Sequence, residues 1–271
     1  MSAPRNVGFI GAGNMGEALI RGLVTSGRLK ADQIRVSDID TTRLHSLETT
    51  YGILTTAGNL HLARAAEVII VAVKPHHVDG VLAEIRDSLD HLPLVISIAA
   101  GVPLSRLQEG LGATVPLIRV MPNTPALVLA GASAIAAGPQ AGAEHLAIAR
   151  LLFEAVGRVV EVPESAMDAV TALSGSGPAY LFLVMESLID AGVLLGLPRV
   201  VARTLVIQTT LGSAKLLDGN DIHPGALKDQ VTSPGGTTIH GLTVLERGGM
   251  RGLLIDAVAA AGRRSEELGM K

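Results

Sequence analysis

The sequence contains no cysteine and no tryptophan, and only 2% of its residues are aromatic. The absence of cysteine excludes disulfide bonds, thiol catalysis and zinc sites built from cysteine. The scarcity of aromatic rings argues against binding of single-stranded nucleic acid by base stacking. A formal net charge of −3 provides no basic surface for nucleic acid or for an anionic membrane. We therefore expect no nucleic-acid partner, and the lack of cysteine is consistent with a cytoplasmic location.

The sequence also lacks an unbroken apolar run long enough to cross a membrane, which takes about 18 residues or more. The most apolar helical stretch, residues 179–197, contains Glu186 and Asp190. We interpret it as a buried or interface helix. The first ten residues lack the apolar core of a signal peptide. These absences predict a protein with no membrane partner.

No histidine spacing suggests a metal site. The 8 histidines are scattered, and the adjacent His76 and His77 cannot face one site on a helix. We therefore predict no metal. The chain has 271 residues, of which 48% are hydrophobic and 17% are charged. This composition is typical of a globular protein with a substantial core.

A glycine-rich turn stands near the start of the chain, in the segment NVGFIGAGNMGEAL. A short apolar strand, residues 7–10, precedes Gly11, Gly13 and Gly16, and a helical pattern follows them. In a dinucleotide site the first glycine permits a tight turn, the second lets the backbone approach a pyrophosphate, and the third allows close helix–strand packing. The N–H groups at the start of that helix then face the phosphates. Because the strand and the helix flank the glycines, we predict a dinucleotide site rather than an empty tight turn.

Strand-like and helix-like segments alternate through the first 160 or so residues, which predicts βαβ units and a doubly wound parallel sheet of the Rossmann type. The predicted strands are 7–10, 34–38, 67–73, 94–99, 116–120, 132–136 and 158–162, with helices at 41–49, 76–89 and 142–156.

No strand pattern follows Pro163, and the remaining chain predicts only helices. They span 178–195, 198–217, 224–231, 239–247 and 250–268. The fold class is therefore α/β, with an N-terminal dinucleotide-binding domain at 1–162 and a C-terminal all-α domain at 163–271. A helical domain this apolar would expose too much hydrophobic surface alone, so we expect a homodimer formed through it.

Ligands of such sheets bind outside the carboxyl ends of the strands. Lys74 ends a buried strand and is expected near the nicotinamide ribose, or else simply faces solvent. Asp38 ends another, where an acid favours NAD by binding the ribose 2′-OH. Arg43 could instead hold the 2′-phosphate of NADP, or Asp38 and Asp40 could merely cap the next helix. The cofactor choice stays open.

Two prolines bracket Asn123 in the segment RVMPNTP and hold it rigidly at a sheet edge. Such a polar group suits contact with nicotinamide or substrate, although a turn that needs asparagine is an alternative. The segment SGSGP, residues 174–178, opens a long helix. It is interpreted either as a helix cap or as a close approach of another backbone or ligand.

The segment SPGGTT, residues 233–238, leads into a helix and combines two glycines with two threonines. Such a turn forms a nest of N–H donors that suits a small anion, and a carboxylate is the natural guest. A glycine-rich loop capped by threonine is the alternative. No Lys, Arg or His occurs from Thr171 to Pro198, so the catalytic lysine expected of a two-domain hydroxyacid dehydrogenase is missing. A protonated imine can accept a hydride without such a strong acid, which favours imine reduction.

The sequence closely resembles the pyrroline-5-carboxylate reductase family in VGFIGAGNMGEAL, AVKP, SIAAGV, RVMPNTP, LSGSGPAY and VTSPGGTTIHGL. These pieces span almost the whole chain. The resemblance implies reduction of 1-pyrroline-5-carboxylate to L-proline with NADPH, or with NADH. It also implies a homodimer with an interlocked helical domain, which often assembles further into a decamer.

The resemblance also assigns residues to the two ligands. The cofactor would be held by Asn59 and by three strand-end segments, which comprise Gly11, Ala12, Gly13, Asn14, Met15, Gly16, Ala72, Val73, Lys74, Pro75, Ile98, Ala99 and Ala100. Ser37, Asp38 and Asn123 are added to this predicted cofactor set because of their positions at strand ends. The substrate would be held by Glu164, Gln230, Ser233, Gly235, Gly236, Thr237 and Thr238. The Thr238 hydroxyl would lie nearest the ring nitrogen and act as the catalytic group. The alternatives are a reductase of another cyclic imine and a non-catalytic dinucleotide-sensing regulator.

Overall fold

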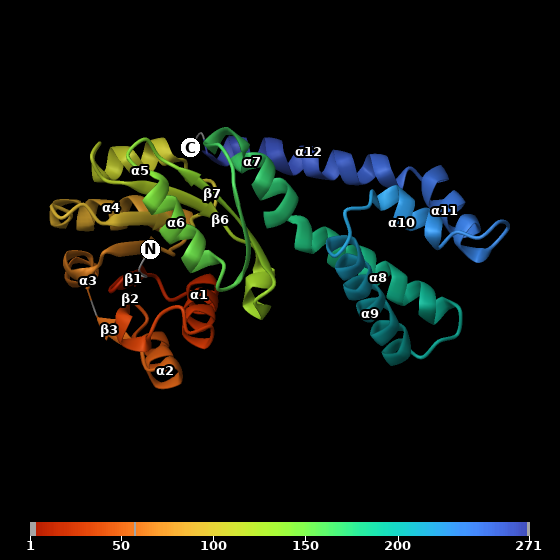
Figure 1. The fold of residues 1–271 in the computed structure, drawn as a ribbon, viewed down its shortest axis with the longest axis horizontal. Coiled ribbons are helices and arrows are strands. Elements are labelled where there is room, and N and C mark those ends of the chain that lie inside the picture. Colours follow the sequence, from red (N-terminus) through yellow and green to blue (C-terminus); the bar gives the residue numbers. More distant parts are fainter. Residues whose placement is uncertain (1–3, 57, 270–271) are drawn as a thin grey trace. The chain divides into compact units, whose positions relative to one another are not determined.

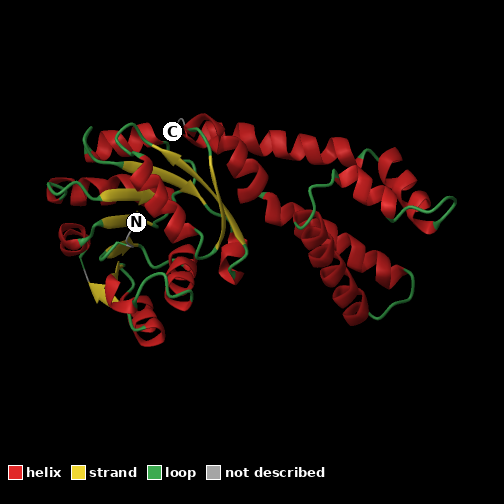
Figure 2. Cartoon of the chain, viewed as in Figure 1, coloured by secondary structure: helices red, strands yellow, loops and turns green. Residues whose placement is uncertain are grey.

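A computed structural model describes residues 4–56 and 58–269, and it divides the chain into two compact units (Figures 1 and 2). The first unit contains the chain up to Ser176 together with the segment from Ala261 onward. The second unit is Gly177–Ala260.

The first unit is built on one sheet, which has eight strands within the described residues, in the order β3-β2-β1-β4-β5-β6-β7-β8. The strands are β1 Val7–Ile10, β2 Ile34–Ser37, β3 Leu54–Thr56, β4 Val68–Val71, β5 Leu94–Ser97, β6 Leu117–Met121, β7 Gly131–Ala137 and β8 Gly157–Glu161. The seven strands predicted from the apolar runs are all present, with ends shifted by a few residues. The three-residue β3 is too short to produce a recognisable pattern and was not predicted.

The expectation of a parallel sheet is wrong for one pair of strands, because β7 runs antiparallel to β6. Only residues 122–130 separate these two strands. A parallel connection requires a crossover of about a dozen residues or more, so this short segment can only turn the chain back. The other strand pairs in the sheet are parallel.

Helices cover both faces of the sheet, and neighbouring residues of a strand point to opposite faces. Phe9 belongs to a buried cluster with Leu19 of α1 and Phe153 of α6. Ile10 belongs to a second cluster with Leu82 of α4. The helices of this unit are α1 Asn14–Thr25, α2 Thr41–Tyr51, α3 Asn59–Ala65, α4 Val78–Ile85, α5 Leu104–Leu111, α6 Ala143–Phe153 and α7 Met167–Val170.

The compact units divide the chain at a different place from the expected boundary at 162/163. Met167 is fully buried in a cluster with Ala134 and Ala136 of β7, so the segment after Pro163 folds against the sheet. Ser265 is also buried and donates a 2.6 Å hydrogen bond to Asp168. These contacts explain why residues 163–176 and the end of the last helix belong to the first unit.

The second unit is helical, as predicted, and the described chain contains no strand after Glu161. Its helices are α8 Gly177–Leu194, α9 Arg199–Asp218, α10 Pro224–Gln230, α11 Thr237–Arg247 and the start of α12 Met250–Gly269. By length and composition alone, one helical stretch within residues 4–56 and 58–269, Glu164–Leu194, could cross a membrane, and none of its most apolar window is buried. Of the two alternatives predicted for the most apolar helix, this exposure favours an interface.

Candidate active site

The three glycines of the first turn have the geometry that a dinucleotide site requires. Gly11 has a φ of +104°, and a Cβ there would lie 2.7 Å from the carbonyl oxygen of Ala72. A Cβ at Gly16 would lie 2.8 Å from the oxygen of Gly11. Gly13 is the residue directly before α1, and no side chain caps the start of this helix. A Cβ added at Gly13 would have no neighbouring atom within 4 Å. The start of α1 is therefore open to an anionic group.

Residues that follow β2 hold this glycine loop through hydrogen bonds to both the N–H and the carbonyl of Ala12. The Ala12 N–H donates to Oδ2 of Asp38 at 2.6 Å, and Nε of Arg43 donates to the Ala12 carbonyl at 2.6 Å. The other carboxylate oxygen of Asp38 accepts the N–H of Asp40 at 2.8 Å. Asp40 caps α2 by accepting the N–H of Arg43. Capping is thus confirmed for Asp40, whereas Asp38 supports the loop.

Arg43 is itself held in place by a polar network on α1 and α2. Its Nη2 lies 2.6 Å from Oε2 of Glu17. The Tyr51 hydroxyl donates to the other oxygen of Glu17 at 3.1 Å. Burial raises the pKa of Tyr51, and the hydrogen bond to Glu17 raises it further, so Tyr51 stays a protonated donor at neutral pH.

Ser37 and Asn59 lie together at the same edge of the sheet. The Ser37 hydroxyl donates to Oδ1 of Asn59 at 2.7 Å, and Nδ2 of Asn59 donates to Glu84 at 2.7 Å. This hydrogen bond therefore fixes the side chains of two predicted cofactor residues relative to each other.

The ends of β4 and β5 extend this edge. The N–H of Ala72 donates to Ile10 at 2.8 Å, and that of Ile98 donates to Val71 at 3.1 Å. The predicted segments 72–75 and 98–100 therefore continue from neighbouring strands. Lys74 is exposed beside them, and its contact with the nicotinamide ribose stays a prediction.

Asn123 uses both ends of its amide within the protein. Its Nδ2 donates to the carbonyl of Ser174 at 3.1 Å, and its Oδ1 accepts the N–H of Ala132 at 2.9 Å. These bonds favour the turn interpretation, and its contact with nicotinamide stays a prediction. Ser174 belongs to a π-helical turn, Thr171–Gly175, whose last glycine would place a Cβ 2.6 Å from the end of the Met121 side chain. The glycine here permits a close approach of another part of the chain.

Arg119 is a candidate that the sequence reasoning missed. This β6 residue is only 5% exposed, and its Nη1 lies 2.8 Å from Oε1 of Glu164. The same oxygen accepts the N–H of Leu104 at 3.1 Å. Glu164, expected at the substrate, is thus tied to the carboxyl edge of the sheet. An arginine within the apolar run PLIRVM was the signal that could have indicated it.

The second unit contains the SPGGTT turn between α10 and α11. Gly235 has a φ of +68°, and the N–H of Gly236 donates to Ser233 at 3.1 Å. Gly236 precedes α11 without a side-chain cap, Thr237 is exposed and Thr238 is half-buried. This arrangement supports the predicted nest of N–H donors. Gln230 ends α10 and is exposed.

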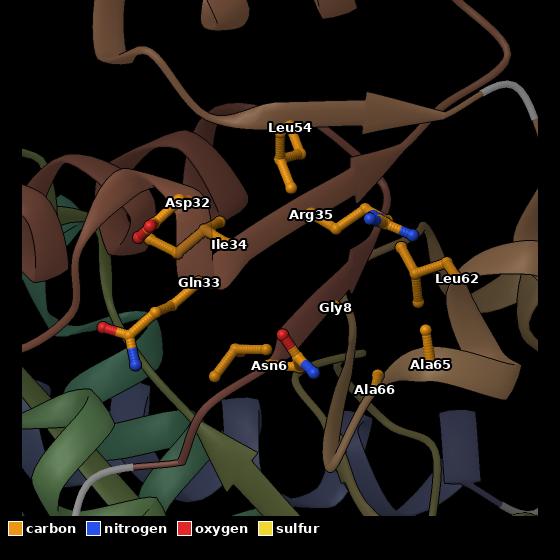
Figure 3. Close-up of a pocket in the computed structure, with 11 residues that line it drawn as sticks. Asn6, Gly8, Asp32, Gln33, Ile34, Arg35, Leu54, Leu62, Ala65 and Ala66 are labelled. Carbon is orange, nitrogen blue, oxygen red and sulfur yellow. The ribbon is translucent and has the colours of Figure 1, made fainter.

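A pocket of about 70 Å³ lies at the opposite ends of the strands (Figure 3). Asn6, Gly8 and Arg35 line it, and none of the predicted site residues does. The candidate site is therefore the carboxyl edge of the sheet rather than this pocket.

The parallel βαβ units, the glycine loop and the open start of α1 define a dinucleotide-dependent oxidoreductase. Two family models match the chain: one described as pyrroline-5-carboxylate reductase dimerisation covers residues 164–268, and one described as NADP oxidoreductase, coenzyme F420-dependent, covers residues 6–101. A pyrroline-5-carboxylate reductase of Synechocystis sp. is 49% identical over 98% of both chains. The chain belongs to the pyrroline-5-carboxylate reductase family.

Solved structures agree with this assignment. A pyrroline-5-carboxylate reductase from Coxiella burnetii has a TM-score of 0.94 and 38% identity over 98% of both chains. A Plasmodium falciparum pyrroline carboxylate reductase, solved with NADP bound, has a TM-score of 0.89 and 34% identity over 99% of both chains. The predicted fold and the predicted family, pyrroline-5-carboxylate reductase, are therefore confirmed.

Proposed function

We propose that the protein reduces 1-pyrroline-5-carboxylate to L-proline with NADPH or NADH, as the final step of proline biosynthesis. The observation that carries this proposal is the presence, in one chain of this family, of both an open glycine loop and a glycine turn that leads into the uncapped start of α11. The first suits a dinucleotide pyrophosphate, and the second suits the carboxylate of a small substrate.

The residues of the first unit fit a nicotinamide dinucleotide. The space at Gly13 and the uncapped N–H groups of α1 suit the pyrophosphate, and Ser37, Asp38 and Asn59 stand at the adenosine end of the edge. When bound there, the dinucleotide supplies the hydride. NADP bound to the Plasmodium relative supports NADP(H), with NAD(H) as the alternative.

The residues of the second unit bind and orient the imine. The N–H groups of Thr237 and Thr238, in the first turn of α11, would hold its carboxylate, and this fixes the plane of the ring. The Thr238 hydroxyl would lie nearest the ring nitrogen and hand over the proton that the product amine needs. The other substrate residues that we propose in this unit are Gln230, Ser233, Gly235 and Gly236.

The helical unit supports a homodimer. Leu194, Leu195 and Val200 are 85%, 84% and 77% exposed, which is unfavourable for a monomer in water. The dimerisation family model covers these residues. A decamer of five such dimers is the higher-order alternative, and the cytoplasm is the proposed location. Sedimentation that shows only monomer at micromolar concentration would contradict the dimer.

The decisive experiment measures NADPH and NADH oxidation by the purified protein with 1-pyrroline-5-carboxylate as the only imine, together with L-proline formation. We expect turnover that depends on both substrates. Parallel reactions with 1-pyrroline-2-carboxylate and simple acyclic imines test the alternative that another imine is the substrate. Tight dinucleotide binding without oxidation by any imine would instead support a sensing regulator.

A further inference from the structure

Arg119 carries a charge inside the sheet, where charges are rare. Its Cα pairs with Ser97 of β5 and with Ala136 of β7, and the residue is 5% exposed. A buried guanidinium is unfavourable unless a counter-ion and hydrogen bonds compensate for the lost water. Glu164 is its ion-pair partner, 45 residues further along the chain.

Glu164 is held by one oxygen and leaves the other unused. Oε1 accepts from both Nη1 of Arg119, at 2.8 Å, and the N–H of Leu104, at 3.1 Å. Oε2 is buried and has no hydrogen-bond partner in the described part of the chain. A buried carboxylate oxygen without a donor is rare in native proteins and calls for a specific explanation.

The pair lies at the edge of the sheet that also carries the glycine loop. The last parallel rungs join Arg119 to Ser97, Ser97 to Val71, and Val71 to Ile10, directly before Gly11. A dinucleotide bound across such an edge extends from the end of β2 towards β5 and β6. The unused oxygen of Glu164 is therefore at the edge of the sheet where the dinucleotide is proposed to bind.

We propose that Arg119 is a positioning residue, which holds Glu164 by Oε1 so that its buried Oε2 accepts a hydrogen bond from an N–H of the bound reactants. This inference rests on the proposed function. Two N–H groups have the required chemistry: the carboxamide of the nicotinamide and the protonated ring nitrogen of the imine. The double contact on Oε1 leaves the carboxylate little freedom to turn, so removal of Arg119 releases it.

The test compares Arg119→Met, Arg119→Lys, Glu164→Gln and the double variant Arg119→Met/Glu164→Gln in the full-length protein. Arg119→Met and Glu164→Gln are each expected to lower kcat/KM by about 10- to 100-fold, which is the usual effect of losing one hydrogen bond to a charged group. Arg119→Lys keeps the charge and should recover part of the loss. The double variant should be about as impaired as the worse single variant, because Arg119 acts through Glu164.

Arg106→Met and Asp79→Asn are the matched controls, since they break an exposed arginine–carboxylate pair in the same unit. They should leave kcat/KM unchanged. If the pair of Arg119 and Glu164 only stabilises the fold, Arg119→Met will melt at a lower temperature yet keep kcat/KM within about twofold of wild type. That result, or losses that multiply in the double variant, would overturn the proposal. If Arg119→Met fails to fold, Arg119→Lys and Glu164→Gln decide in the same way.

Cofactor titrations without imine identify the donor. If it is the carboxamide, Glu164→Gln weakens NADPH binding, and this effect disappears with the 3-acetylpyridine analogue, which lacks the amide N–H. If it is the ring nitrogen, NADPH binding is unchanged and the KM for 1-pyrroline-5-carboxylate rises. Unchanged values in both measurements would overturn the inference. A wild-type protein inactive on this imine would refute the proposed function alone, and the NADPH titrations would still test the pair.

Discussion

The carboxylate of Asp38 accepts the N–H of Ala12 at 2.6 Å, across 26 residues of sequence. With Asp40 on its other oxygen, Asp38 binds two backbone donors at once. Asp38 therefore fixes the backbone of the glycine loop, in addition to any contact with the ribose of a dinucleotide.

Asp38→Asn should weaken the binding of both dinucleotides. An amide has one acceptor oxygen for two backbone donors, so one N–H loses its partner and the dissociation constants of NADH and NADPH should both rise by about tenfold. Asp40→Asn is the matched control, because asparagine caps a helix about as well as aspartate. Fluorescence titration measures both cofactors. Loss of NADH binding with NADPH unaffected would show instead that Asp38 acts only on the ribose 2′-OH.

Gly13→Ala should separate cofactor binding from folding. The site of the new Cβ is open and Gly13 has a φ of −64°, so alanine fits without strain. The methyl group would nevertheless stand where the backbone must approach the pyrophosphate. We expect an unchanged melting temperature without cofactor and an NADPH dissociation constant raised by about tenfold or more.

Gly142→Ala is the control for this change, since Gly142 also precedes a helix and has open space around it. It lies outside the candidate site and should bind NADPH like the wild type. Equal NADPH affinity in the two variants would contradict the placement of the pyrophosphate at Gly13.

Thr238→Ala should lower kcat/KM by about 100-fold or more, because the hydroxyl that hands over the proton is lost. Thr238→Ser should retain most of the activity. Thr243→Ala is matched to it on the same helix, where the Thr243 hydroxyl donates only to the carbonyl of Ile239. Steady-state kinetics and circular dichroism test these variants together. Near wild-type turnover of a folded Thr238→Ala protein would remove this hydroxyl from the mechanism.

The exposed ion pair between Asp79 and Arg106 should affect stability in one pH range only. The hydrogen bond from Arg106 lowers the pKa of Asp79 below its usual value of 3.8. A carboxyl group with a lowered pKa in the folded state stabilises the protein above pH 3.8, and this contribution is lost as the pH falls through the folded-state pKa.

Asp79→Asn should therefore be less stable than wild type at neutral pH by about 0.5 kcal/mol or less, since solvent screens the pair. Melting temperatures of the two proteins should converge as the pH falls below 3.8. A difference that persists or grows in acid would contradict the ion-pair explanation.

Much of the molecule follows from local patterns of residues. Apolar runs predict strands such as Val7–Ile10 and Val68–Val71, and the helices after Pro163 follow from stretches that lack any strand pattern. The spacing of Gly11, Gly13 and Gly16 predicts the glycine loop, because each residue acts on its immediate neighbours. The SPGGTT turn is local in the same sense, so the sequence alone indicates the turn at Gly235 and Gly236.

Other features depend on which strands and loops become neighbours. The chain reversal between β6 and β7 depends on a short connection, and the end of the first unit depends on Met167 packing against β7. Asp38 meets Ala12, and Arg119 meets Glu164, only because the sheet order brings distant segments to one edge. Hydrogen bonds and ion pairs act over a few ångströms of space, whatever the separation along the chain. The residue spacing therefore determined the loops that suit the ligands, and the tertiary structure decided which charged side chains support them.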